Sequence, residues 1–381
     1  MRLGDCHNFR DFRELARRRL PGPIFDYIDG AADDEVTYRR NTASFEHCDL
    51  VPDVLRGVEA VDLSVTVMGQ KLAVPFYCSP TALQRLFHHE GERAVAAAAS
   101  KYGTMFGVSS LGTVSLEELR RAYSTPQIYQ FYFHKDRGLN RAMLQRAKEA
   151  GIEVMMLTVD SITGGNRERD LRTGFSIPFS LTLAGMLQFA LRPMWGLNYL
   201  IHERFKLPQL DKHVDTSGDA MSIGRYFTEM LDPSMNWSDV TEMVRDWNGQ
   251  FCLKGVMSVG DAKRAAEIGC TGIVLSNHGG RQLDGSRAPF DQLAEIVDAV
   301  GDRLDVMMDG GVQRGTHVLK ALSLGAKAVG VGRFYLFPLA AAGQAGVERA
   351  LGLMMAEIER GMKLMGRASI SQLSRDNLRF R

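Results

Sequence analysis

Eight short runs of β-branched, aromatic and other apolar residues recur along this 381-residue chain, each bounded by turn-forming residues. They cover residues 74–79, 104–109, 127–132, 153–159, 250–255, 272–276, 304–309 and 328–332. Apolar residues at three-to-four spacing, the pattern of an amphipathic helix, cover 91–103, 115–123, 139–151, 259–269, 289–301 and 314–325. Strands that alternate with helices form parallel sheets, and eight such units predict a closed (β/α)8 TIM barrel.

An open, doubly wound sheet is the alternative for such a pattern, but no GxGxxG motif follows the first strand. We therefore expect residues 1–381 to form a single domain. Within this domain, residues 1–70 would form an N-terminal helical extension on the bottom or flank of the barrel, and residues 71–381 would form the barrel itself. Residues 161–249 form a long insertion loop after the fourth strand, and a loop of that length usually serves function.

The charge balance and the cysteines exclude several classes of partner. Lys and Arg number 46 against 45 Asp and Glu, a net charge of +1, so no basic stripe for nucleic acid is expected. Five scattered Cys without CxxC spacing predict reduced thiols, with no disulfide frame and no metal site. The charged N-terminus lacks the apolar core of a secretory signal, which predicts a cytoplasmic protein.

Residues 176–201, SIPFSLTLAGMLQFALRPMWGLNYLI, are strongly apolar. Arg192 and Pro193 split this segment into two pieces that are each too short to cross a bilayer, which takes about 20 apolar residues. The segment predicts either a helix that packs on the domain or on a partner subunit, or a monotopic anchor in the membrane interface.

The C-terminal end of each predicted strand carries polar, cationic or small residues, and the active sites of (β/α)8 barrels form at that end of the strands. They are Pro80, Thr81, Ala82, Ser109, Gln130, Tyr132, Thr158, Asp160, Lys254, Ser276, His278, Arg281, Asp309, Gly310, Gly311, Gly332 and Arg333. A single strand-end Ser or Thr is more often a turn former or a helix cap. A polar group on every strand favours a binding site instead.

The final two units, DGG and VGVGR, indicate phosphate binding, although their glycines would also suit tight turns. In the segment SNHGGRQLDG, His278 suits proton transfer near neutral pH, and Arg281 suits a carboxylate. Asp160 would orient the imidazole. A lone strand-end His is usually structural, but the adjacent Arg and the phosphate-like loops favour catalysis.

The motifs FDYIDGAADDE, SPTAL, QFYFHKDRG, LTVD, GGNRERDL, LKGV, SNHGGRQLDG, DGGV and GAKAVGVGR resemble the FMN-dependent L-2-hydroxy acid dehydrogenases and oxidases over essentially the whole chain. The resemblance implies FMN as cofactor and oxidation of an L-2-hydroxy acid to the 2-oxo acid. It implies that His278 is the base and that Asp160 is its partner. Arg281 and Arg167 would bind the substrate carboxylate, and Tyr27 and Tyr132 would donate hydrogen bonds to the substrate. Lys254 would be a cation at the flavin. It implies further flavin contacts by Pro80, Thr81, Ala82, Ser109, Gln130, Thr158 and Ser276, and ribityl–phosphate contacts by Asp309, Gly310, Gly311, Val312, Gln313, Gly332 and Arg333.

Two positions depart from the family or vary within it. Gln313 stands where the family usually has Arg, which implies retained but weaker FMN binding; Arg314 should point elsewhere. Leu111 falls where the side chain over the substrate varies, and it leaves room for lactate or a longer acid. GGNRERDL followed by GFSIP is most similar to the mandelate dehydrogenase branch, which carries a membrane-binding segment in this loop.

The leading prediction is therefore an L-2-hydroxy acid dehydrogenase, with L-lactate as the favoured substrate. The branch implies membrane contact through 176–201 and a quinone or cytochrome as electron acceptor. The absence of a secretory signal predicts contact with the inner face of the cell membrane, and the family resemblance implies a homotetramer. The alternatives are a soluble oxidase that reduces O2 to H2O2, a dehydrogenase of mandelate or long-chain hydroxy acids, and a non-catalytic flavin-binding protein. Whether His278 removes the hydroxyl proton or the carbon-bound proton stays open.

Overall fold

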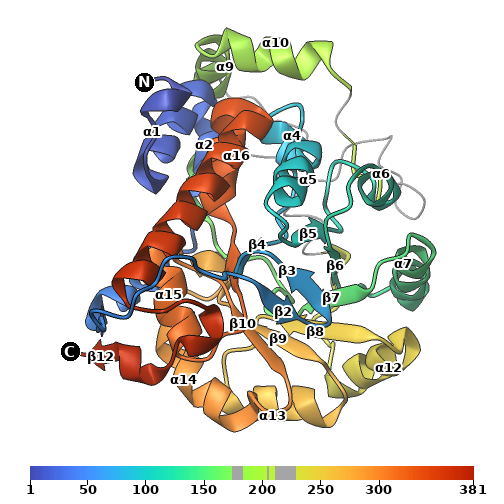
Figure 1. Cartoon of the computed structure of the whole chain (residues 1–381). Coiled ribbons are helices and arrows are strands. Elements are labelled where there is room, and N and C mark those ends of the chain that lie inside the picture. The colour runs from blue at the N-terminus through green and yellow to red at the C-terminus, as the bar shows by residue number, and fades with distance from the viewer. Residues whose placement is uncertain (174–182, 204–205, 211–228) are drawn as a thin grey trace.

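The computed structural model describes residues 1–173, 183–203, 206–210 and 229–381 (Figure 1). Eight parallel strands form a closed barrel in which β11 pairs with β4. They are β4 (Phe76–Cys78), β5 (Phe106–Ser109), β6 (Gln127–Tyr132), β7 (Val154–Thr158), β8 (Gln250–Lys254), β9 (Gly272–Leu275), β10 (Asp305–Met308) and β11 (Val329–Val331). Each lies inside its predicted run, so the predicted TIM barrel is confirmed and the open sheet is excluded.

Helices follow the strands and surround the barrel. The predicted ones are α5 (Glu92–Lys101), α6 (Leu116–Ala122), α7 (Arg137–Glu149), α13 (Val259–Glu267), α14 (Pro289–Val300) and α15 (Gly315–Ser323). The sequence pattern also left two unassigned, α12 (Trp237–Trp247) and α16 (Arg333–Leu364), the latter with a break at Ala342 and Gly343. Asp136 caps the start of α7, and Gly151 just past its end has a φ of 73°, a conformation that favours glycine.

The N-terminal extension contributes to both ends of the barrel. Its strands β2 (Val65–Val67) and β3 (Gln70–Leu72) form a hairpin whose turn residue Met68 is buried against the inward side chains of the barrel strands. This hairpin covers the bottom of the barrel. The helices α1 (Phe9–Arg19), α2 (Gly22–Asp29) and α3 (Val36–Ala43) instead supply walls at the opposite, functional end. Strand β1 (Cys48–Leu50) pairs antiparallel with β12 (Leu378–Phe380), near the other end of the chain.

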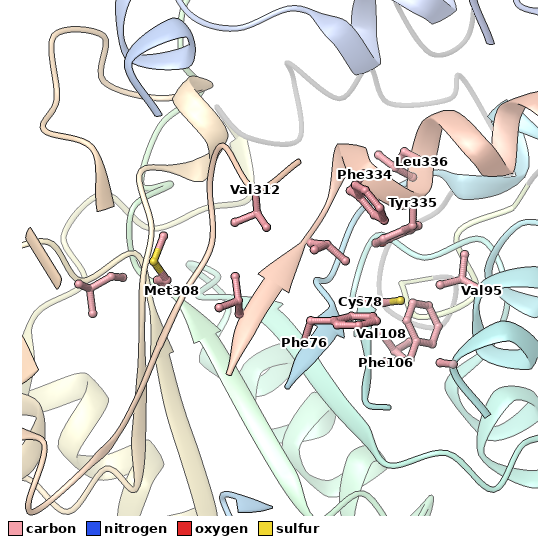
Figure 2. Close-up of a cluster of buried hydrophobic side chains, with 14 of the residues drawn as sticks. Phe76, Cys78, Val95, Phe106, Val108, Met308, Val312, Phe334, Tyr335 and Leu336 are labelled. Atoms are coloured by element: carbon pink, nitrogen blue, oxygen red, sulfur yellow. The ribbon is translucent and has the colours of Figure 1, made fainter. Parts of the chain in front are cut away.

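A continuous apolar core lies between the strands and the surrounding helices. Figure 2 shows part of it, where Phe76 and Cys78 of β4 lie beside Phe106 and Val108 of β5, and Val95 of α5 faces them. All five side chains are fully buried. Such close packing holds the strands in place, so the residues at the strand ends have fixed positions.

The region after β7 contains α8 (Glu168–Thr173), α9 (Leu183–Ala190) and α10 (Pro193–Ile201). Residues 176–182 of the predicted apolar segment lie outside the described residues. Arg192 and Pro193 separate α9 from α10, as the sequence predicts. Among the described residues, no helix has the length and apolar content needed to cross a membrane. The division into one domain with an insertion over 161–249 stays a prediction. The last part of that insertion contains α12, which occupies the helix position of the fourth barrel unit.

Candidate active site

A pocket of about 1290 Å³, counting the part open to solvent, lies at the C-terminal ends of all eight barrel strands. All the site residues predicted from the sequence line it except Asp160 and Ser276, which lie behind it. The pocket has further lining residues that were not predicted: Phe9, Ile28, Tyr38, Ser79, Phe87, Gly279, Gln282, Gly330, Phe334 and Leu336. The strand ends therefore form one site, and the N-terminal helices complete its wall.

His278 and Asp160 form the predicted pair. The imidazole Nδ1 lies 2.9 Å from Asp160 Oδ1, and the Ser161 hydroxyl donates to the same carboxylate oxygen at 2.9 Å. Burial alone would raise the pKa of Asp160, but His278, Lys254 and Ser161 together hold it below its ordinary value. Because the ionised carboxylate accepts a hydrogen bond from Nδ1–H, it favours the tautomer in which Nε2 is free to accept a proton. His278 is thus prepared to act as a general base.

The backbone around His278 adopts a rare conformation. His278, Gly279 and Gly280 all have positive φ angles, of 57°, 63° and 77°. A Cβ at Gly280 would lie 2.7 Å from the backbone nitrogen of Tyr38 on α3, so only glycine allows this approach. The side-chain amides of Asn277 and Asn41 also exchange hydrogen bonds of 2.7 and 2.8 Å. The N-terminal extension therefore holds the loop that positions the base.

Lys254 belongs to a buried polar network at the ends of β8, β9 and β10. Its Nζ donates to Ser276 Oγ at 2.8 Å and lies 3.2 Å from Asp309 Oδ2, while Ser276 Oγ donates to Asp309 Oδ1 at 2.6 Å. Burial alone would lower the pKa of Lys254, but Asp309 and Asp160 raise it above its ordinary value. The ammonium is therefore charged at neutral pH. Ser276, predicted to contact the flavin, is fully buried and instead orients Lys254.

Two guanidinium groups flank one aromatic ring. The Cζ atoms of Arg281 and Arg167 lie 4.9 and 5.6 Å from the centre of the Tyr27 ring. Arg281 also donates to the carbonyl oxygens of Tyr27 and Gly30 at 2.7 and 2.9 Å. Burial, and then the nearby charge of Arg167, lower the pKa of Arg281 to about 10, so it remains charged at pH 7. Two cations on one pocket wall suit a carboxylate ligand.

The wall near Leu111 is also fixed by hydrogen bonds. The backbone nitrogen of Leu111 donates to Ser109 Oγ, and its carbonyl oxygen accepts from the backbone nitrogen of Leu83. A chain of side-chain hydrogen bonds of 2.9 Å each runs from Ser109 through Gln130 to Thr158 across three strands. These groups form a polar row of the kind that can contact the edge of a flavin ring.

The last two barrel units form the glycine-rich end of the pocket, where Gly310 and Gly311 have φ angles of 96° and 77°. Arg333 lies here, but its guanidinium donates to three backbone carbonyls and stacks over the Tyr38 ring. The Gln313 amide donates to Thr42 Oγ1 at 3.2 Å. Arg314 pairs with Glu357 at 3.2 Å, so it points elsewhere as predicted. The polar row, the Lys254 ammonium and this glycine-rich end together fit FMN.

Gln313→Arg is expected to tighten FMN binding by up to tenfold, because it adds a cation at the phosphate end of the pocket. Titration of apoprotein with FMN, followed by flavin fluorescence, measures the change in Kd. Lys327→Arg, on the loop before β11, is the matched control for a change of basic side chain elsewhere. An unchanged Kd for Gln313→Arg would show that position 313 does not contribute to phosphate binding.

Comparison with known proteins decides between the classes of enzyme that such a pocket could serve. The family model of the FMN-dependent dehydrogenases matches residues 16–380. The chain belongs to this family. The predicted family and the FMN cofactor are thereby confirmed.

Similar proteins from several sources cover nearly the whole of this chain. A putative L-lactate dehydrogenase of Mycobacterium tuberculosis is 36% identical over 98% of this chain and 89% of its own length. An L-lactate oxidase of a Nostoc species is 39% identical over 96% of both chains. The crystal structure of a monotopic membrane protein, (S)-mandelate dehydrogenase, has a TM-score of 0.94 at 33% identity and covers 99% of this chain and 100% of its own. The predicted activity class, FMN-dependent oxidation of an L-2-hydroxy acid, is confirmed.

Proposed function

We propose that this dehydrogenase oxidises L-lactate to pyruvate and passes the electrons to a quinone or a cytochrome at a membrane surface. The observation that carries the proposal is the arrangement of one pocket, in which His278 with its Asp160 partner shares the space with the Arg281 and Arg167 cations. A small 2-hydroxy acid has a carboxylate for the cations and a hydroxyl-bearing carbon for the base. Leu111, an aliphatic side chain on the wall, leaves space for the methyl group of lactate.

In this proposal each polar side chain has a separate task. Arg281 and Arg167 bind the carboxylate, while Tyr27 and Tyr132 donate hydrogen bonds to the substrate. His278 accepts the proton that leaves the substrate, whether from oxygen or from carbon. When FMN is bound beside these side chains, it would supply the acceptor for the two electrons. The Lys254 ammonium stabilises the negative charge that accompanies them.

Anaerobic flavin bleaching tests the substrate. The loaded enzyme is mixed without oxygen with L-lactate, glycolate, L-mandelate or a longer L-2-hydroxy acid, and the loss of flavin absorbance is followed. We expect L-lactate to give the largest ratio of bleaching rate to half-saturating concentration. If mandelate or a longer acid gave a larger ratio than L-lactate, that acid would be assigned as the substrate instead. If no acid bleached the flavin, the chain would be a flavin-binding protein without this activity.

A soluble oxidase is the second candidate, because the L-lactate oxidase of Nostoc is as similar as the dehydrogenases. Turnover with oxygen alone and with a quinone separates the two functions. We expect oxygen to support less than a tenth of the rate that a quinone supports. Equal rates with both acceptors would assign the oxidase function to this chain.

The exposed apolar surface of α9 and α10 supports membrane contact. Its side chains Leu187, Leu191, Met194, Leu197, Leu200 and Ile201 are 50 to 79% exposed. Figure 1 shows the two helices at the edge of the molecule, away from the barrel strands. Burial of one such side chain contributes about 1.5–3 kcal/mol, so a row of them would hold the protein in the membrane interface. We propose peripheral attachment to the inner face of the cell membrane, and assembly as a homotetramer as in the resembling branch.

Replacement of Leu197 and Leu200 by Glu is expected to lower binding to lipid vesicles at least tenfold, because two buried apolar groups become charged. Flotation with phosphatidylglycerol–phosphatidylethanolamine vesicles measures the bound fraction. Leu364→Glu at the end of α16, where Leu364 is 69% exposed, is the matched control and should bind like the parent. Equal binding by all three proteins would exclude α10 as the attachment site.

A further inference from the structure

A second cavity lies next to the active-site pocket. It measures about 1340 Å³, counting the part open to solvent, and its walls come from the end of α1, the residues after α4 (Gln84–Phe87), α10 and α16. Phe87 lines both cavities, and its ring stacks on the Tyr27 ring with the centres 6.2 Å apart. On α16, Leu336 lines the first cavity and Ala340, about one turn later, lines the second. The two cavities are therefore neighbours that share a wall.

Aromatic and imidazole rings make up much of this second cavity. The rings of His89 and His202 stack with their centres 3.7 Å apart at 12°, and His88 stacks on His89 at 4.5 Å. Trp195 and Tyr199 of α10 stack at 5.2 Å and 18°. Parallel planar groups of this kind suit a flat conjugated ligand, because such a ring can stack against them over its whole face.

Hydrogen bonds hold two of these rings in place, and two neighbouring imidazoles are neutral. His202 Nδ1 donates to the carbonyl oxygen of Asn198 at 2.7 Å, and Trp195 Nε1 donates to the carbonyl oxygen of Leu86 at 2.9 Å, so both rings are held in place. Burial lowers the pKa of His88 and of His89, which leaves their imidazoles neutral at pH 7. A neutral imidazole can donate one hydrogen bond to a carbonyl oxygen.

Cationic side chains outnumber acidic ones around this cavity. Arg18, Arg19, Arg85 and Arg192 line it together with one carboxylate, Glu203, which pairs with Arg85. Arg192 Nε is buried and has no hydrogen-bond partner in the part of the chain that the structure describes. The guanidinium of Arg192, which lines the cavity, has further N–H groups that can donate to an acceptor oxygen of a ligand.

The cavity opens beside the exposed apolar surface of α9 and α10. Leu191 and Met194 line the cavity and are also 62 and 68% exposed. Trp195 and Tyr199 come from the same helix. A ligand dissolved in the membrane could thus reach the stacked rings directly from the surface that we propose to contact lipid.

We propose that this second cavity binds the ring of the quinone that accepts the electrons. The inference rests on the proposed function, because it names the acceptor and its place. The hydroxy acid loses two electrons and two protons and becomes the 2-oxo acid. The quinone gains two electrons, and each of its two carbonyl oxygens gains a proton, which gives the quinol. The imidazoles of His88 and His89 and the guanidinium of Arg192 donate hydrogen bonds to these oxygens, His202 stacks on His89, and Phe87 separates the quinone from the active-site pocket.

An anionic phospholipid headgroup would also suit the arginines. It would make no use of the stacked rings, however, and it would need no wall in common with the active site. Both features are expected for an electron acceptor, because it must lie close to the site where the electrons originate. The geometry therefore favours a quinone, and binding of a headgroup is an outcome that the experiment can detect.

Tryptophan fluorescence tests binding without turnover. The described helices supply three tryptophans, and only Trp195 lines the cavity, whereas Trp237 and Trp247 lie on α12. We expect duroquinone, a soluble tetramethylbenzoquinone, to quench the FMN-loaded enzyme in a saturable manner. The saturable part should be lost in Trp195→Phe and retained in Trp237→Phe. Saturable quenching that survives in Trp195→Phe would overturn the proposal. Quenching of Trp195 by phosphatidylglycerol vesicles but not by duroquinone would make the cavity a headgroup site.

Reoxidation kinetics provide an independent test through His202→Leu. We expect its reduced form to be reoxidised by duroquinone at least tenfold more slowly than the parent, while L-lactate bleaches its flavin at the parental rate. His47→Leu, at an exposed position far from this cavity, is the matched control. Reoxidation of His202→Leu at the parental rate would contradict the proposal. If L-lactate failed to bleach the parent enzyme, the proposed function would fail, whereas the quenching result involves no hydroxy acid and stands by itself.

Discussion

His278→Gln is expected to lower kcat for L-lactate by about 10⁴-fold, at the upper end of the effect of a general base. Glutamine has about the size of histidine and can still accept a hydrogen bond, but it cannot take up a proton near neutral pH. Asp160 would then have no imidazolium to stabilise. Stopped-flow measurement of anaerobic flavin bleaching follows this step directly, before any acceptor is involved.

The FMN content of His278→Gln shows whether its pocket is intact. The variant should retain FMN, because glutamine has about the size of histidine and preserves this part of the pocket wall. His7→Gln, at an exposed N-terminal position, should bleach like the parent. A loss of less than tenfold in His278→Gln with full FMN content would show that another group accepts the proton.

Arg281→Lys should have the second largest effect, a fall of about 10²-fold in kcat/KM. Lysine keeps the charge but loses the planar fork that binds a carboxylate through two hydrogen bonds. It also loses the hydrogen bonds to the carbonyl oxygens of Tyr27 and Gly30. Loss of a buried, hydrogen-bonded charge contact costs about 2–5 kcal/mol, which corresponds to between about 30-fold and several thousand-fold.

Steady-state kinetics across L-lactate concentrations measure this effect, and KM should account for most of it. Arg264→Lys on α13, where Arg264 forms an exposed pair with Glu267, is the matched control and should leave kcat/KM unchanged. A kcat/KM for Arg281→Lys within threefold of the parent would mean that the substrate carboxylate binds elsewhere, and Arg167 would be the first alternative.

The barrel and the strand-end residues could be predicted from the sequence because each depends on a local pattern. A buried parallel strand needs a short apolar run, and the residue that follows it must lie at the C-terminal rim. The strand-end pattern thus predicts Lys254, His278 and Arg281 in one pocket, and the structure has all three there. The pattern could not distinguish Ser276, which points into the protein, from its neighbours, because side-chain direction at a strand end depends on the turn that follows.

The walls contributed by helices could not be predicted in the same way. Phe9, Tyr38 and Phe87 reach the pocket from α1, α3 and α4, and nothing in their local sequence indicates which face of each helix meets the barrel. The glycine pair after His278 is the one sequence feature that could have indicated a nearby segment such as Tyr38 on α3. Gly280 is needed because α3 approaches the loop so closely. Contacts between distant segments determine these positions, and a single sequence does not reveal them.

The pairing of β1 with β12 has a consequence for biosynthesis. Residues 48–50 leave the ribosome long before residues 378–380, so this two-stranded ribbon cannot form until translation of the barrel is complete. The neighbouring helices α2 and α3, which cover the catalytic end, lie just upstream of this late-forming ribbon. The ribbon therefore ties the N-terminal extension to the C-terminal segment only after all eight barrel strands have been synthesised.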